Sequence, residues 1–138
     1  MYWRQVAKDN NRGLADLNKA IELEPDNAHA YMNRAAFYSL DLEDYNAAIA
    51  DLTRAIEIEK QNSELALYYY QRGECYQKLN MYAEAIADYT KYISLTEQKD
   101  PKSVLLPWAY KLRAECYEAI GDKAKAQADK QKAKMLKH

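Results

Sequence analysis

The strongest constraint on the fold of this chain is a short pattern that recurs three times along it. The pattern is a tyrosine, a small residue four positions later and a second tyrosine three positions further on: Tyr31-x3-Ala35-x2-Tyr38, Tyr69-x3-Gly73-x2-Tyr76 and Tyr110-x3-Ala114-x2-Tyr117. Residues at positions i, i+4 and i+7 lie on one face of an α-helix. Each copy therefore predicts a helix with an aromatic face.

A second helix is expected after each copy, because positions seven apart then carry mostly small residues. These pairs are Ala48 and Ala55, Ala85 and Tyr92, and Ala126 and Ala133. Small residues let two helices approach closely, and aromatic rings fill the space beside the contact. Such a helical hairpin cannot bury its apolar face alone, so the copies are expected to stack on one another.

The recurring units resemble the tetratricopeptide repeat family, whose unit of about 34 residues carries a W-x2-L-G-x2-Y, A-x3-F and Pro pattern. The resemblance covers nearly the whole chain. It rests on Leu17, Ala20 and Pro25, on Tyr31, Ala35, Tyr38, Tyr45, Ala48, Leu52 and Ala55, on Tyr69, Gly73, Tyr76, Tyr82, Ala85 and Tyr89, and on Tyr110, Ala114, Tyr117, Gly121 and Ala126.

This resemblance implies an all-α fold, a right-handed α-solenoid of antiparallel helix-turn-helix repeats within one domain. About three full repeats are expected after a truncated first one. The expected bounds are 1–26 for the partial repeat, 27–62 and 63–100 for the next two, and 101–138 for a repeat that ends in a capping helix.

Three departures from the family spacing predict local irregularities. An extra residue within Leu40–Asp44 lengthens the turn between two helices, and Tyr92 places a large ring where the family has alanine. Pro101 and Pro107 predict a loop or a short irregular helix over Thr96–Pro107. We expect the third and fourth repeats to be offset from regular stacking as a result.

The first repeat is predicted to be incomplete. Counting back from Ala20 places Met1 near the middle of an opening helix, which leaves an apolar face to be covered. That face is expected to comprise Leu14, Leu17 and Ile21, covered either by Tyr2 and Trp3 or by a second chain. We favour excision from a longer protein, with a homodimer contact as a side effect.

The last helix concentrates positive charge. Residues 1–121 carry 14 Lys and Arg against 19 Asp and Glu, whereas residues 122–138 carry six Lys and two Asp. Lys123, Lys130 and Lys134 stand where the family has apolar residues, which suits a solvated cap. Nucleic acid and anionic membrane are alternative partners. We favour the solvated helix, because it has no apolar face for membrane insertion.

The two cysteines occupy equivalent places, one residue before Tyr76 and one before Tyr117. Packed helix axes stand roughly 8 to 10 Å apart, whereas a disulfide needs Cα atoms about 4.4 to 6.8 Å apart. We therefore interpret Cys75 and Cys116 as buried thiols, with a reactive or metal-binding role as the alternative. No apolar run is long enough to cross a bilayer, and the start lacks a secretory signal, so a cytoplasmic location is expected.

Catalysis is not expected. The chain has two histidines and three glycines, so no His pair, catalytic triad or phosphate-cradling loop can be assembled. Carboxylates are numerous, but they fall on polar helix faces or in turns, where charged side chains are usually just solvated. No enzyme activity, metal or cofactor is predicted.

The family resemblance implies that the first helix of each repeat lines a concave groove that binds peptides. The positions that this places in the groove are His29, Met32, Asn33, Ala36 and Ser39, then Leu67, Tyr70, Gln71, Glu74, Gln77 and Lys78, and finally Trp108, Lys111, Glu115 and Glu118. Tyr70 and Trp108 are not required by the packing pattern, so they are the candidate anchors. The alternative for Trp108 is that it only packs over the irregular join beside Pro107.

A subclass of the family clamps the C-terminal carboxylate of chaperone tails with lysine, asparagine and arginine. In the most direct alignment the clamp cations and asparagine fall on Met32, Ala36, Trp108 and Leu112. Counting from the truncated repeat leaves Asn33 as a lone match, with Leu67 and Gln71 in place of cations. Chaperone tails are therefore not the expected ligand. A peptide of mixed polarity, with a basic element near Glu74, Glu115 and Glu118, fits better.

The sequence therefore predicts a non-enzymatic protein-interaction scaffold that holds a peptide segment of a partner in its groove. The alternative is a structural role, in which the chain self-associates through its incomplete first repeat. Nucleic-acid binding through the last helix is a third and weaker reading, which predicts affinity that falls steeply with salt.

Overall fold

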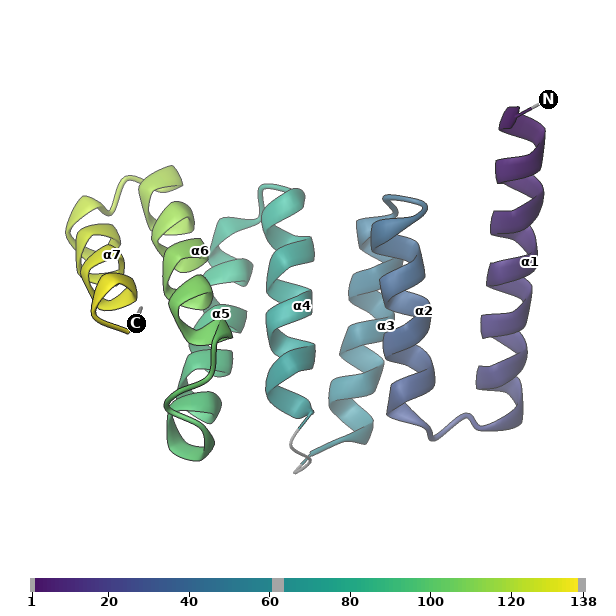
Figure 1. Ribbon diagram of the computed structural model, residues 1–138, viewed down its shortest axis with the longest axis horizontal. Helices are drawn as coiled ribbons and strands as arrows, with labels where there is room; N and C mark the ends of the chain where they lie inside the picture. The colour runs from purple at the N-terminus through teal and green to yellow at the C-terminus, as the bar shows by residue number, and fades with distance from the viewer. Residues whose placement is uncertain (1, 61–63, 137–138) are drawn as a thin grey trace. The chain divides into compact units, whose positions relative to one another are not determined.

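The computed structural model describes residues 2–60 and 64–136, with side chains described from residue 7 onward. The chain divides into two compact units, which we call the N-terminal unit (Met1–Asn62) and the C-terminal unit (Ser63–His138) (Figure 1). All regular secondary structure in the described ranges is α-helical. The predicted all-α fold class is confirmed.

The N-terminal unit contains one hairpin and one additional helix. Its helices are α1 (Tyr2–Leu23), α2 (Ala28–Leu40) and α3 (Tyr45–Ile58). The antiparallel helices α2 and α3 form the hairpin, and α1 packs against α2.

Short polar side chains start the two helices of that hairpin. Asn27 accepts a hydrogen bond from the backbone N–H of His29, and Asp44 accepts one from the backbone N–H of Ala47. Such caps satisfy N–H groups that have no partner within the helix. They explain why α2 and α3 begin where they do.

The C-terminal unit contains two stacked hairpins. Its helices are α4 (Leu65–Lys78), α5 (Tyr82–Lys99), α6 (Leu105–Ala119) and α7 (Lys123–Leu136). The hairpins are α4–α5 and α6–α7, and α5 packs against α6 to join them (Figure 1). One apolar core, built largely from tyrosine, alanine and leucine, runs through this unit.

The turn within each hairpin contains a residue in the left-handed conformation. The turn between α2 and α3 has one residue more than the turns between α4 and α5 and between α6 and α7, which confirms the predicted lengthening at Leu40–Asp44. The left-handed residues are Glu43 (φ 52°), Asn80 (φ 60°) and Gly121 (φ 87°).

The predicted irregular segment over Thr96–Pro107 is wrong at both ends. Helix α5 continues to Lys99 and α6 begins at Leu105, so only Asp100–Val104 connects them. Pro107 lies in the first turn of α6, where the backbone N–H has no partner within the helix. A proline there costs the helix little.

Most of the predicted small packing positions are buried in the three hairpins, whereas Ala133 is half-buried. Ala48, Ala55 and Ala85 are completely inaccessible to solvent, and Ala126 is nearly so. Gly73 shows how close the helices come, since a Cβ atom there would lie 2.9 Å from Cε1 of Tyr89. That distance is shorter than a normal carbon contact.

The prediction that the chain starts in the middle of an opening helix is wrong. Residues 2–23 form one continuous helix, α1. Leu14, Leu17 and Ile21, which we expected to form an uncovered face, are half-buried. Helix α1 meets α2 closely, because a Cβ atom at Gly13 would lie 2.8 Å from the Phe37 ring. The side chains of Tyr2 and Trp3 lie outside the described residues.

Both cysteines are free and buried, as predicted. Burial raises the pKa of each thiol to about 11, with smaller contributions from Glu74 for Cys75 and from Glu115 for Cys116. A thiol with such a pKa is almost entirely protonated near neutral pH, which makes it a poor nucleophile and a poor metal ligand.

Candidate functional site

The predicted groove positions of the N-terminal unit all lie on α2. His29 and Asn33 are exposed, whereas Met32 and Ser39 are half-buried. The Ser39 hydroxyl donates a hydrogen bond to the carbonyl oxygen of Ala36, four residues before the end of the helix. These positions belong to a different unit from the remaining candidates.

The remaining predicted positions other than Tyr70 lie on two helices of the C-terminal unit, and we call this set the α4–α6 face. Its members are Leu67, Gln71, Glu74, Gln77 and Lys78 on α4, and Trp108, Lys111, Glu115 and Glu118 on α6. A hydrogen bond of 3.0 Å from Gln77 Nε2 to Glu115 Oε2 joins the two helices. This bond places the C-terminal halves of α4 and α6 next to each other.

Tyr70 is not the free anchor that the sequence suggested. Its side chain is 8 % exposed and packs edge-on against Tyr92, with ring centroids 5.1 Å apart, and against Tyr89 at 5.9 Å. The large ring of Tyr92 at a position usually held by alanine creates the need for this partner. Burial raises the pKa of Tyr70 to about 12, with smaller effects from Glu74 and Tyr92.

Trp108 is the exposed aromatic residue of the α4–α6 face. Its side chain is 54 % exposed, so it does not merely fill the join beside Pro107. The Lys111 ammonium lies 5.0 Å from the centroid of the indole ring, one helical turn further along α6. This cation–π contact leaves much of the ring surface open to solvent.

The carboxylates of the α4–α6 face differ in what they contact. Glu118 forms an ion pair with Lys130 of α7, and Glu115 accepts the amide hydrogen bond from Gln77. The Gln77 side chain in turn accepts a hydrogen bond of 2.7 Å from the Tyr89 hydroxyl. Loss of solvent around Glu74 raises the pKa of its carboxyl group, and Lys78 opposes this.

Gln71 contributes an unpaired acceptor to the same face. Its Oε1 atom is buried and has no hydrogen-bond partner among the residues that the structure describes. A buried carbonyl oxygen without a donor raises the free energy of the folded state.

The structure reveals three arginine–aspartate pairs that the sequence analysis missed. In each hairpin an arginine of the first helix donates two hydrogen bonds to an aspartate of the second, with N–O distances of 2.7–2.8 Å. The pairs are Arg34 and Asp51, Arg72 and Asp88, and Arg113 and Asp129. Each guanidinium also lies 5.4–5.9 Å from the centroids of the two tyrosine rings of the recurring pattern.

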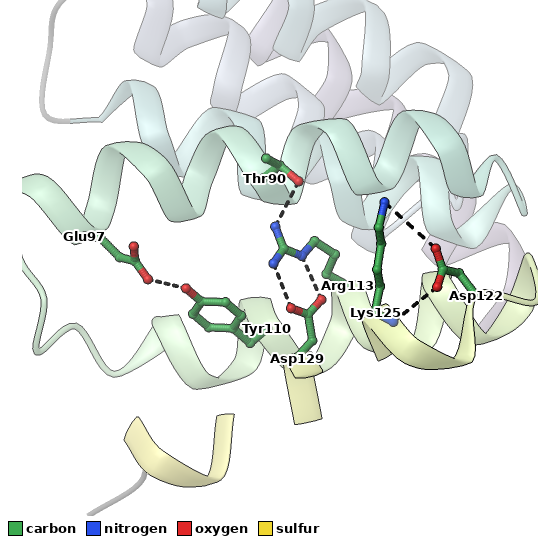
Figure 2. A network of polar contacts seen from close by, with 7 residues as sticks. All are labelled: Thr90, Glu97, Tyr110, Arg113, Asp122, Lys125 and Asp129. Carbon is green, nitrogen blue, oxygen red and sulfur yellow. Dashed lines mark hydrogen bonds and ion pairs between the residues drawn. The ribbon is translucent and has the colours of Figure 1, made fainter. Parts of the chain in front are cut away.

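Figure 2 shows the pair of Arg113 and Asp129 in the C-terminal unit, with the residues around it. Arg113 binds Asp129 of α7 with one side of its guanidinium and donates a 3.0 Å hydrogen bond to the Thr90 hydroxyl of α5. The Tyr110 hydroxyl donates a hydrogen bond to Glu97 of α5. In the N-terminal unit, Arg34 similarly reaches Asn18 of α1 at 2.9 Å. These arginines therefore fix the first helix of a hairpin to its neighbours on two sides.

A sequence signal for these pairs does exist. Arginine follows the first tyrosine of every copy by three residues, and aspartate follows Ala48, Ala85 and Ala126 by three residues. The recurring spacing of 16 or 17 residues between the arginine and the aspartate could have identified them.

In the part of the chain that is described, no group of three or more His, Cys, Asp or Glu side chains is placed to hold a metal ion. None of the described helices combines the length and the apolar character needed to cross a membrane.

Two of the hairpins, α2–α3 and α4–α5, match models of a known protein family. Family models described as tetratricopeptide repeat match residues 28–62 and 66–99, which together make up half of the chain. No curated protein sequence matches the chain.

Solved structures match over nearly the whole chain. The crystal structure of MamA protein is 28 % identical with a TM-score of 0.78 and covers 92 % of this chain. The crystal structure of BtubC (BKLC) from P. vanneervenii is 20 % identical with a TM-score of 0.79 and covers 97 % of this chain. This chain spans 63 % of the MamA chain and 57 % of the BtubC chain.

Proposed function

Because the chain belongs to the tetratricopeptide repeat family and has its α-solenoid fold, we propose that it is a non-enzymatic interaction scaffold that binds a peptide segment of a partner protein on the α4–α6 face. Repeats of this family provide rigid helical surfaces on which exposed side chains act as binding residues. The fold alone does not choose the partner. The side chains of the α4–α6 face therefore carry the argument.

Trp108 is the observation on which the proposal chiefly rests. An exposed indole is a large, stiff, amphipathic group, and tryptophan is enriched among residues that dominate binding energy. Its helix is held in place by Arg113, which binds α5 and α7 at once. A side chain presented by such a fixed helix loses little freedom when a ligand binds.

The Glu115 carboxylate favours a ligand that donates hydrogen bonds, because it receives a bond from a neutral amide rather than from a cation. Glu118 is already paired with Lys130, so it does not support the predicted basic element. We therefore place the basic element of the ligand near Glu74 and Glu115, with an apolar residue on Trp108.

Site-specific photocrosslinking tests this proposal. The photoreactive residue benzoylphenylalanine would replace Trp108, or Met135 as the matched control, and each variant would be irradiated in lysate of the source cell. Met135 is also exposed and apolar, but it lies on α7. We expect a partner segment that crosslinks from position 108 and not from position 135. The same crosslinks from both positions, or none from position 108, would contradict the proposal.

Self-association through the N-terminal unit is a second candidate function. Ala20 and Leu23 on α1 are exposed, although the residues that match them in the hairpins are buried or half-buried. This candidate predicts a molecular mass that rises with protein concentration in sedimentation equilibrium. A constant monomer mass over the same range would reject it.

A further inference from the structure

One aspartate of α1 matches the aspartates that bind arginine in the three hairpins. Asp51, Asp88 and Asp129 each follow a buried alanine by three residues, and each is 4–5 % exposed. Asp16 follows Gly13 by three residues and precedes Ala20 by four, which is the same spacing. Helix α1 therefore has the sequence of a second helix of a hairpin.

Asp16 nevertheless lacks the partner that its counterparts have. The side chain is exposed, and no hydrogen bond or ion pair joins it to any residue in the described ranges. Each counterpart accepts two hydrogen bonds from an arginine. A carboxylate placed as in those hairpins, but without a cation, is complementary to an arginine.

The residues around Asp16 extend the same match. Asp16, Ala20 and Leu23 stand at positions i, i+4 and i+7, so they share one face of α1. Ala20 is exposed and Leu23 is 69 % exposed, whereas the matching Ala55 is fully buried and Ile58 is half-buried. We call this surface the open face of α1. Gly13, seven residues before Ala20, lies at the edge of this face and close to Phe37 of α2, whereas Asn18 contacts α2 from another side of the helix.

We propose that the open face of α1 binds a helix of a partner protein that carries the pattern Tyr-x2-Arg-small-x2-Tyr. The three hairpins show what this helix would do. Its arginine would form the paired hydrogen bonds with Asp16, its two tyrosine rings would flank the guanidinium, and its small residue would allow close approach near Ala20.

A second copy of this chain, the occupant that the self-association candidate requires, fits the open face less well, because it has no free arginine within the pattern. The arginines that follow the pattern are Arg34, Arg72 and Arg113, and each is already bound to the aspartate of its own hairpin. A second copy could supply one of them only by opening that hairpin. A separate helix with a free arginine has no such cost.

A synthetic helix tests the proposal directly. The probe is a fluorescein-labelled peptide with the sequence of residues 27–41, which contains the whole pattern, stabilised as a helix by a lactam bridge on its polar face. Fluorescence anisotropy would measure its binding to the full chain. We expect saturable binding that weakens about tenfold or more when the peptide arginine is replaced by glutamine, and equally when the chain carries Asp16→Asn.

A matched variant controls for charge. Glu22→Gln removes an exposed carboxylate from another side of the same helix, where Glu22 pairs with Lys19, and it should leave the affinity for the peptide unchanged. Because Asp16 and Glu22 are both exposed, both variants are expected to keep the circular dichroism spectrum of the original chain.

Three results would overturn the proposal. The first is absence of binding, and the second is binding that neither Asp16→Asn nor the glutamine peptide weakens. The third is a concentration-dependent dimer of the chain alone that Asp16→Asn dissociates, because a second copy would then occupy the open face. The outcome is independent of the α4–α6 face, since Trp108 lies in the other unit.

Discussion

At the scale of single residues, two glycines serve different purposes in the C-terminal unit. Gly73 is required for space, because a Cβ atom would lie 2.9 Å from Tyr89 Cε1 and 3.3 Å from Asp88 Cβ. Gly121 is required for conformation, because its φ is +87° while the space around it is open. The same pair of substitutions should therefore affect the free energy of unfolding in a different order at the two sites.

We predict that Gly73→Ala lowers the free energy of unfolding by about 1–3 kcal/mol because of overpacking. Gly121→Ala should lower it by about 1–2 kcal/mol through the left-handed backbone. Asparagine tolerates that conformation, so Gly121→Asn should be milder than Gly121→Ala, whereas Gly73→Asn should be worse than Gly73→Ala. Urea denaturation of the four variants measures this. The same order at both sites would contradict the assignment.

The cysteines give a second prediction at this scale. Since burial raises the pKa of Cys75 and of Cys116 to about 11, the thiolate is scarce in the folded protein at pH 8. Reaction with Ellman's reagent at pH 8 should be slow in buffer and fast in a denaturing concentration of guanidinium chloride. Rapid labelling of the folded protein would show that at least one thiol is accessible.

At the scale of helices, the arginine–aspartate pairs decide how the two helices of a hairpin are fixed to each other. The Arg72 and Asp88 side chains are only 17 % and 5 % exposed, and two hydrogen bonds join them across α4 and α5. Breaking such a pair leaves a charge without a partner in a partly desolvated place.

We predict that Asp88→Asn lowers the free energy of unfolding by about 2–3 kcal/mol, below the range for fully buried pairs because Arg72 keeps some contact with water. Glu57→Gln is the control, since it removes an exposed ion pair with Arg54 and should cost less than about 1 kcal/mol. Urea denaturation followed by circular dichroism distinguishes the two. Equal effects would mean that the hairpin does not depend on the pair.

The helices were largely predictable from the sequence, but their connections and polar contacts were less so. Small residues seven apart gave the helix contacts, because close packing requires a small side chain whatever the surroundings. The segment at Pro107 was wrongly predicted, since proline breaks a helix interior but is tolerated in a first turn. Tyr70 was assigned to the groove because the packing pattern does not require it. Its contact with Tyr92 depends on how α4 and α5 pack, which the pattern does not specify.

At the scale of the whole molecule, the two units carry charges of opposite sign. Residues 1–62 contain 7 Lys and Arg and 11 Asp and Glu, and residues 63–138 contain 13 and 10. Contacts with charged partners should therefore differ between the units and weaken as salt screens them. The indole of Trp108 belongs to the unit with the positive balance, so an apolar contact rather than net charge must supply much of the affinity that we propose.

The measurement that tests the central claim most directly is the affinity of the chain for the partner segment captured from position 108. Isothermal titration with that segment as a synthetic peptide would compare the original chain with Trp108→Ala and Met135→Ala. We predict that Trp108→Ala weakens binding by about tenfold or more, as expected for a dominant aromatic anchor, while Met135→Ala has no effect. Equal affinities of the original chain and a folded Trp108→Ala variant would contradict peptide binding on the α4–α6 face.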